Sequence, residues 1–249
     1  PAGIGININA TDTGVKPTIV ARNIVHSMAQ YDCIRIVGAT NLVVEGNGLE
    51  LGHTACAGIN MMDCNNFSVV GNAIKVGIAG TVLEAGVKVA ALIASVTTGS
   101  ISNNAVSGAL ARGVSIYSSS PSLEDVSITG NAIRLTAAGA FGVYADACAG
   151  LNLNNTITAP IPTRMGACVN SVVGGKLRTT ATNALHLSGT CTGTAVLSDI
   201  VLQGGPVTST ATGVTVYPVA FQGTGADVTS TAILGHDAET RFSVTKMDG

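Results

Sequence analysis

Short stretches of alternating apolar and polar residues recur along the whole chain, and each is interrupted by a sharp break. In the clearest copy, Val126, Ile128 and Ile133 alternate with polar neighbours around the pair Gly130-Asn131. Alternation with a period of two is typical of β-strands. Gly and Asn tolerate the left-handed backbone conformation that a tight bend requires. The pattern therefore predicts two short strands joined at a sharp corner.

The corner position recurs at intervals of 20 to 32 residues. A repeat of this length indicates a solenoid, in which each repeat forms one coil and stacks on the next. Polar side chains stacked at the corner can hydrogen-bond along the axis, each bond contributing about 1 kcal/mol net. We expect a ladder made of Asn23, Asn47, Asn72, Asn104, Asn131 and Asn155, continued in the same slot by Gly175, Asp199 and Thr231.

A second motif, Gly-apolar-x-apolar, lies upstream of each corner and adds a third strand to each coil. It begins at Gly58, Gly86, Gly113, Gly142 and Gly213, and at Cys33 and Ala184 with the glycine replaced. Crossovers between parallel strands are nearly always right-handed. The fold class predicted is thus all-β: a right-handed single-stranded parallel β-helix (solenoid) of about nine coils, with about three strands per coil.

The repeat is uninterrupted, so we expect one domain over residues 1–249. The alternation has already begun at Ile4 to Ile8, which favours a piece of a longer chain, and residues 232–249 are expected to cap the last coil. Residues 79–95 are rich in Ala, Leu and Val, but the match at Gly86 favours a strand over a helix. Residues 158–164 are expected to form a loop, because Pro160 and Pro162 each remove a hydrogen-bond donor.

Composition narrows the function classes. Charged residues make up 10% of the chain, against about 25% in a typical soluble domain. The formal net charge of −2, without a basic cluster, disfavours nucleic-acid binding. No apolar run approaches the roughly 20 residues needed to span a membrane. The six cysteines form no metal-ligand or disulfide spacing, so we expect reduced, buried thiols, no metal site and no cofactor.

The Gly-Val-x-Val and Ile-x-Gly-Asn-x-Ile repeats resemble the parallel β-helices of the pectin-lyase-like superfamily, over nearly the whole chain. That superfamily includes pectate lyases, polygalacturonases, alginate epimerases and bacteriophage tailspikes. Its bacterial pectinases usually carry an aromatic-bearing, charge-rich cleft. The neutral, Ala/Gly/Thr-rich coils of this chain look more like a tailspike body. This resemblance implies a homotrimer in the virion (phage tail) that recognises bacterial surface polysaccharide; the alternative location is extracellular or at the cell surface.

The candidate site is the outward column of the first strand in each coil. Polysaccharide hydrolysis usually needs two carboxylates about 5 to 9.5 Å apart, and lyase chemistry needs a base and a positive group. Stacked coils lie about 4.8 Å apart, so equivalent positions one or two coils apart suit either chemistry. The column runs through Arg35, Asn60, Lys88, Ser115, Tyr144, His186 and Thr215, followed two residues later by Tyr117, Asp146 and Tyr217.

From this column we expect a sugar groove with Asp146 as the catalytic residue. The substrate-binding residues would be Lys88, Tyr117, Tyr144, His186 and Tyr217. The alternative is a solvated sheet face whose polar residues have no common role. The leading hypothesis is a phage tailspike β-helix that recognises, with or without cleavage, bacterial surface polysaccharide. Two alternatives are a secreted polysaccharide lyase, hydrolase or epimerase, and a non-catalytic structural or adhesin rod.

Overall fold

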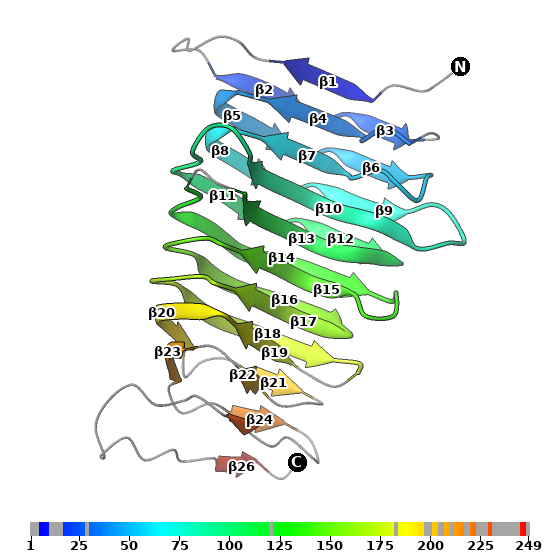
Figure 1. Cartoon of the computed structure of the whole chain (residues 1–249). Coiled ribbons are helices and arrows are strands. Elements are labelled where there is room, and N and C mark those ends of the chain that lie inside the picture. Colours follow the sequence, from blue (N-terminus) through cyan, green and yellow to red (C-terminus); the bar gives the residue numbers. More distant parts are fainter. Residues whose placement is uncertain are drawn as a thin grey trace.

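The chain folds as a parallel β-solenoid, as the repeat predicts (Figure 1). The computed structural model describes residues 5–9, 17–27, 30–119, 122–181 and 184–196 in full. It also describes the backbone of the later strands, which lie between residues 201 and 247. The described residues form no helix, and hence none with the length and hydrophobicity of a membrane-spanning segment. The solenoid has about seven turns, against about nine expected.

One wall of the solenoid is a ten-stranded parallel sheet. Parallel neighbours in this sheet are one turn apart in sequence, so residues at the same register form columns along the axis. Its strands are β1 (Ile6–Asn9), β4 (Ile34–Val37), β7 (Ile59–Met62), β10 (Val82–Ala91), β13 (Leu110–Ser118), β15 (Phe141–Asp146), β17 (Ile161–Gly166), β19 (Leu185–Ser188), β22 (Val207–Ser209) and β25 (Thr229–Ser230).

The other walls form one sixteen-stranded sheet that bends at the predicted corner. Strands before the corner are β2 (Thr18–Ala21), β5 (Thr40–Glu45), β8 (Asn65–Val70) and β11 (Gly99–Ser102); those after it are β3 (Ile24–Ser27), β6 (Gly48–Leu51), β9 (Ala73–Val76) and β12 (Ala105–Gly108). Single strands then pass through the corner: β14 (Val126–Leu135), β16 (Asn152–Ala159) and β18 (Val172–Thr179). The remaining members are β20 (Thr190–Val196), β21 (Val201–Gln203), β23 (Thr212–Val216), β24 (Ala220–Gln222) and β26 (Thr245–Met247).

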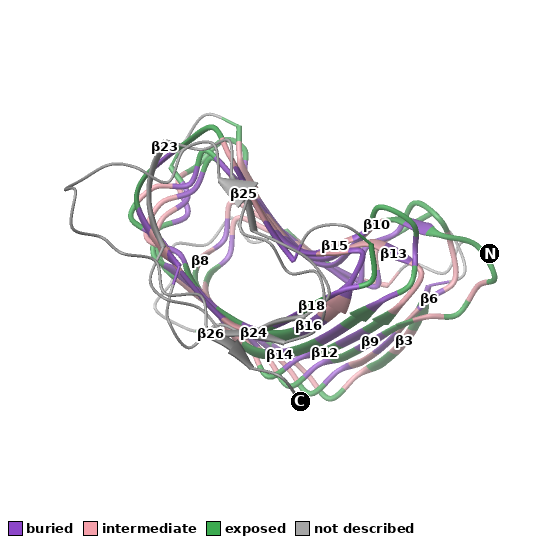
Figure 2. Cartoon of the chain, turned by 90° about the horizontal axis from the view of Figure 1, so that it is seen from below, coloured by how far each residue is buried: buried purple, intermediate pink, exposed green. Residues whose placement is uncertain are grey.

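The alternating apolar residues fill the interior of the solenoid. Val126, Ile128 and Ile133 of β14 are all buried, and their polar neighbours are not. Figure 2, which looks along the axis, shows buried and exposed positions alternating along the walls. All six cysteines are free and buried in this core, as expected.

The six corner asparagines are joined by hydrogen bonds along the axis. The Oδ1 atom of Asn131 accepts from both the backbone N–H and the side-chain Nδ2 of Asn104, each at 2.9 Å. The same paired bonds link each of the other neighbouring asparagines, from Asn23 to Asn155. Gly175 lies at the next register position, where it has no side chain to continue the ladder. Asp199 and Thr231 lie outside the described residues.

The second motif requires glycine because the backbone there lies very close to the next turn and to a side chain of the corner strand. A Cβ atom on Gly113 would lie 2.5 Å from the carbonyl oxygen of Gly142 on the next turn and 2.6 Å from Cγ2 of Ile133. Gly58, Gly86 and Gly142 meet comparable obstacles, each within 2.5 Å or 2.6 Å of a neighbouring carbonyl or aliphatic side chain. The motif therefore marks where the first strand packs against the corner strand.

Two local expectations were wrong. Residues 158–164 are not a loop: Ala159 ends β16 and Ile161 begins β17, with Pro160 alone between them. Pro162 is tolerated within β17 because Ile161 pairs with Phe141 and Thr163 with Val143 on either side of it. Gly213 to Val216 belong to β23, which pairs with β20 and not with the ten-stranded sheet. Residues 79–95 contain β10, a strand as expected.

Candidate functional site

The outer face of the ten-stranded sheet brings together most of the predicted site residues. The registers place Lys88, Ser115, Tyr144, Arg164 and His186 in one column on successive strands from β10 to β19. Arg35 and Asn60 extend this column through β4 and β7. Tyr117 pairs with Asp146 two residues farther along the strands. Thr215 is on β23, away from this sheet, and Tyr217 lies outside the described residues.

The centre of this face is an arginine–tyrosine cluster formed by Arg112, Phe141, Tyr144 and Arg164. The guanidinium carbons of Arg112 and Arg164 lie 4.8 and 5.0 Å from the centroid of the Tyr144 ring. Phe141 packs edge-on against Tyr144 with ring centroids 5.6 Å apart, and it lies 5.7 Å from the guanidinium carbon of Arg164. A guanidinium is attracted to an aromatic ring within about 6 Å of its centroid. Tyr144 therefore holds one arginine from the preceding turn and one from the following turn.

Neither Arg112 nor Arg164 forms an ion pair with a carboxylate of the described residues. The three ion pairs among the described residues involve only Glu50 and Glu84 as acids. Lys88 forms one of them, with its Nζ 3.0 Å from Oε2 of Glu84. The Nε atom of Arg112 is buried without a hydrogen-bond partner. Stacking against a ring orients a guanidinium while leaving its N–H edge free to bind a carboxylate or phosphate in a bidentate manner.

His186 adds a group that can gain a positive charge at the end of the column. Burial of the ring, and then the positive charge of the neighbouring Arg164, lower the pKa of His186 below its ordinary value. An unperturbed histidine has a pKa of about 6.5. His186 is therefore neutral at pH 7 and becomes cationic only in more acidic solution.

Asp146 does not have a carboxylate partner at the positions on which the hydrolase hypothesis depends. Its register neighbours are Tyr117 and Gly166, and two turns away the equivalent positions hold Ala90 and Ser188. A Cβ atom on Gly166 would lie 2.5 Å from Oδ1 of Asp146, so this glycine leaves the space that the carboxylate fills. Asp146 thus has no carboxylate at the equivalent positions of these neighbouring turns.

Sequence reasoning missed three members of the arginine–tyrosine cluster. Arg164 follows two prolines that favour a loop, although it occupies the same column as Tyr144. Arg112 and Phe141 precede the motif glycines Gly113 and Gly142 and pair with each other. The position before each motif glycine was the signal that could have revealed them. Among the described residues, no three His, Cys, Asp or Glu side chains gather as a metal site.

Comparison with family models, with curated proteins and with solved structures finds no match to this chain.

Proposed function

We propose that the protein is the β-solenoid of a phage tailspike that recognises an acidic polysaccharide on the bacterial surface. The polymer lies along the outer face of the ten-stranded sheet. The observation that carries the proposal is the arginine–tyrosine cluster, in which Tyr144 holds Arg112 and Arg164 without a carboxylate partner.

The shape of the face suits a linear polymer better than a compact ligand. The column from Arg35 on β4 to His186 on β19 crosses six inter-strand steps, which span about 29 Å at the usual spacing of parallel strands. Apart from the buried Ser115, the polar side chains along the column can contact successive sugar units. A ligand that extends along the axis uses the whole column, whereas a small molecule uses one or two steps.

The charge of the face selects an acidic polymer. Arg112 and Arg164 each offer N–H donors, and hydrogen bonds from a guanidinium to a carboxylate are about twice as strong as neutral ones. Lys88 is already paired with Glu84, so Arg112 and Arg164 supply the unpaired charge at the centre of the face. The proposed role is binding, and hydrolysis by a carboxylate pair is disfavoured because Asp146 has no carboxylate at equivalent positions on the next two turns.

Location in the virion and assembly as a homotrimer belong to the same proposal. Both rest on the resemblance of the repeats to tailspike bodies, and the outer face is the binding surface in either a single chain or an assembly. Light scattering of the purified protein measures its mass in solution: three chains support the tailspike assignment, and a single chain contradicts this part of it.

A polysaccharide panel tests the proposal. Purified capsular and O-antigen polysaccharides, acidic and neutral, are immobilised, and binding and release of fragments are measured together. Binding to acidic polymers without fragment release is the expected result. Fragment release would instead indicate a lyase, hydrolase or epimerase, and the absence of binding across the panel would favour the structural rod.

A further inference from the structure

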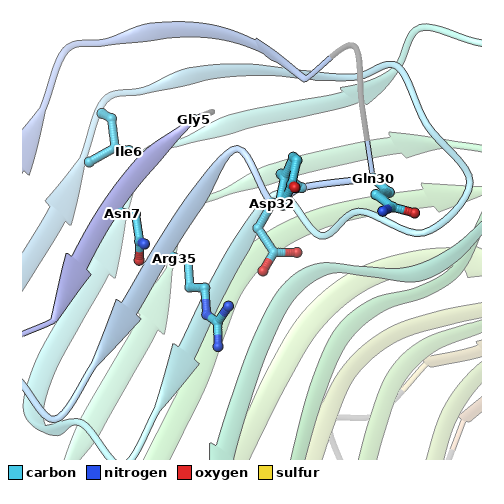
Figure 3. Close-up of a pocket in the computed structure, with 7 residues that line it drawn as sticks. Gly5, Ile6, Asn7, Gln30, Asp32 and Arg35 are labelled. Carbon is cyan, nitrogen blue, oxygen red and sulfur yellow. The ribbon is translucent and has the colours of Figure 1, made fainter. Parts of the chain in front are cut away.

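A second feature of the outer face is a cavity of about 230 Å³ at the β1–β4 end of the ten-stranded sheet. Figure 3 shows Asp32 and Arg35 extending to the same side from neighbouring positions of the chain, with Asn7 on the adjacent strand. The lining residues are Gly5, Ile6, Asn7, Gln30, Tyr31, Asp32 and Arg35.

The carboxylate of Asp32 is held in a fixed orientation. Its Oδ1 accepts the backbone N–H of Ala57 at 2.8 Å, and its Oδ2 accepts Nδ2 of Asn60 at 2.7 Å. A carboxylate can accept about four hydrogen bonds, so half of its capacity remains for a ligand. Asp32 therefore presents to the cavity an acceptor with unused capacity.

Arg35 supplies the complementary donors. Its side chain is exposed and takes part in none of the hydrogen bonds or ion pairs found among the described residues. With one carboxylate and one guanidinium, the cavity carries no net charge, unlike the arginine–tyrosine cluster. The amides of Asn7 and Gln30 add neutral groups that both donate and accept, and Ile6 and the half-exposed Tyr31 supply apolar surface.

The size of the cavity limits the ligand. Pockets for drug-sized molecules measure about 300 to 1,000 Å³, so 230 Å³ suits one small ring. A sugar hydroxyl is both a donor and an acceptor. Adjacent hydroxyls on one ring can therefore donate to Asp32 while accepting from Arg35. An acidic ring would bring a second negative charge close to Asp32, which is unfavourable.

We infer that this cavity binds a single uncharged sugar ring through adjacent hydroxyl groups, with Asp32 as the acceptor and Arg35 as the donor. The role of this neutral-sugar subsite in polymer binding depends on the proposed function above. Four inter-strand steps separate Arg35 on β4 from Tyr144 on β15, or about 19 Å along the axis. The two sites together select a heteropolymer in which neutral and acidic sugars alternate over that distance.

Nuclear magnetic resonance of the whole ¹⁵N-labelled chain tests the subsite with defined probes. Methyl glycosides of glucose, galactose and mannose are titrated separately, and methyl glucuronide serves as the acidic comparison. At least one neutral glycoside should shift the backbone amides of Asp32 and Arg35 without shifting that of Tyr144. Arg35→Gln should weaken this binding about tenfold through loss of a charged donor. Arg134→Gln, on the exposed outer side of β14, should leave it unchanged.

The outcomes separate this inference from the proposed function. Arg35→Gln is the main variant because the Arg35 side chain has no hydrogen bond or ion pair within the described part of the chain, whereas Asp32→Asn also disturbs Ala57 and Asn60. If no neutral glycoside shifts Asp32 or Arg35 while an acidic polysaccharide still shifts Tyr144, the subsite is wrong and the polymer site stands. If neutral glycosides shift Asp32 and Arg35 but no acidic polysaccharide binds, the subsite stands and the proposed function fails.

Discussion

The guanidinium carbon of Arg164 lies 5.0 Å from the centroid of the Tyr144 ring, although the two residues belong to different turns of the solenoid. Because β15 and β17 are adjacent parallel strands in register, the contact follows directly from the stacking of the turns. Arg112 makes the corresponding contact from the other side. The cluster therefore depends on register as much as on residue type, which makes it sensitive to small changes.

Removing the charge of either stacked arginine should weaken binding of an acidic polysaccharide. Arg112→Gln and Arg164→Gln should each reduce affinity about tenfold or more, because each removes a charge-assisted hydrogen-bond donor. Biolayer interferometry with the immobilised polymer measures this loss. Arg134→Gln is the matched control, since Arg134 is exposed on the outer side of β14 and away from this face. Equal losses in all three variants would point to non-specific charge attraction.

Affinity should rise in acidic solution because of His186. Burial and the nearby Arg164 lower the pKa of His186, so it is neutral at pH 7 and gains its charge only below about pH 6.5. That charge should strengthen binding of an acidic polymer about threefold to fivefold, the scale of an exposed ion pair. Titrations between pH 8 and pH 5 should show the rise in the parent protein and not in His186→Gln. An identical rise in both proteins would assign it to another group.

The asparagine ladder should dominate local stability. Asn104→Ala leaves the buried backbone N–H of Asn72 without its acceptor. Nδ2 of Asn72 loses one bond but still donates to the carbonyls of Val44 and Val70. An unsatisfied buried group costs about 1 to 3 kcal/mol, and the side-chain bond from Asn104 to Asn131 is lost as well, so we expect a loss of about 3 kcal/mol in the free energy of unfolding, measured by denaturant titration. Asn152→Ala, at an exposed position of β16, should change it by less than about 0.5 kcal/mol. Similar losses in both variants would contradict a special role for the ladder.

The motif glycine should not tolerate a methyl group. Gly113→Ala places a Cβ atom 2.5 Å from the carbonyl oxygen of Gly142, and overpacking of this kind costs about 1 to 3 kcal/mol. Gly48 is the control, because a Cβ atom there would meet nothing closer than 4.0 Å and the next column positions already hold Ala73 and Ala105. Gly48→Ala should be neutral or stabilising in thermal unfolding. Destabilisation by both changes would mean that loss of glycine itself, and not the contact, is responsible.

The sequence predicted the fold well because its repeat residues have local causes. Asn131 occupies a corner that every turn shares, and Gly113 marks a close approach that recurs on successive turns. The pattern fades where the corner residue changes to Gly175, and the number of turns is about seven against about nine expected. Arg164 was not predicted because the prolines before it favour a loop when the sequence is considered alone. In the structure, β17 pairs with β15 on both sides of Pro162.

The candidate site was less predictable than the fold. The column through Lys88, Tyr144 and His186 followed from counting repeats. The stacking of Arg112 against Tyr144 depends on side-chain directions, which spacing alone does not specify. The cavity beside Asp32 depends on the backbone path of residues 30–35, which supply four of its lining residues. The repeat pattern does not predict that path.

The most direct test of the central claim compares one acidic polysaccharide with its carboxyl-reduced derivative, which has the same chain and linkages without the charge. Binding of both polymers to the parent protein and to the Arg112→Gln, Arg164→Gln double variant is measured by titration calorimetry. The account predicts strong binding only for the acidic polymer and the parent protein, with a fall at high salt. Equal affinity for the acidic and reduced polymers, or full affinity in the double variant, would contradict recognition of an acidic polymer by this face.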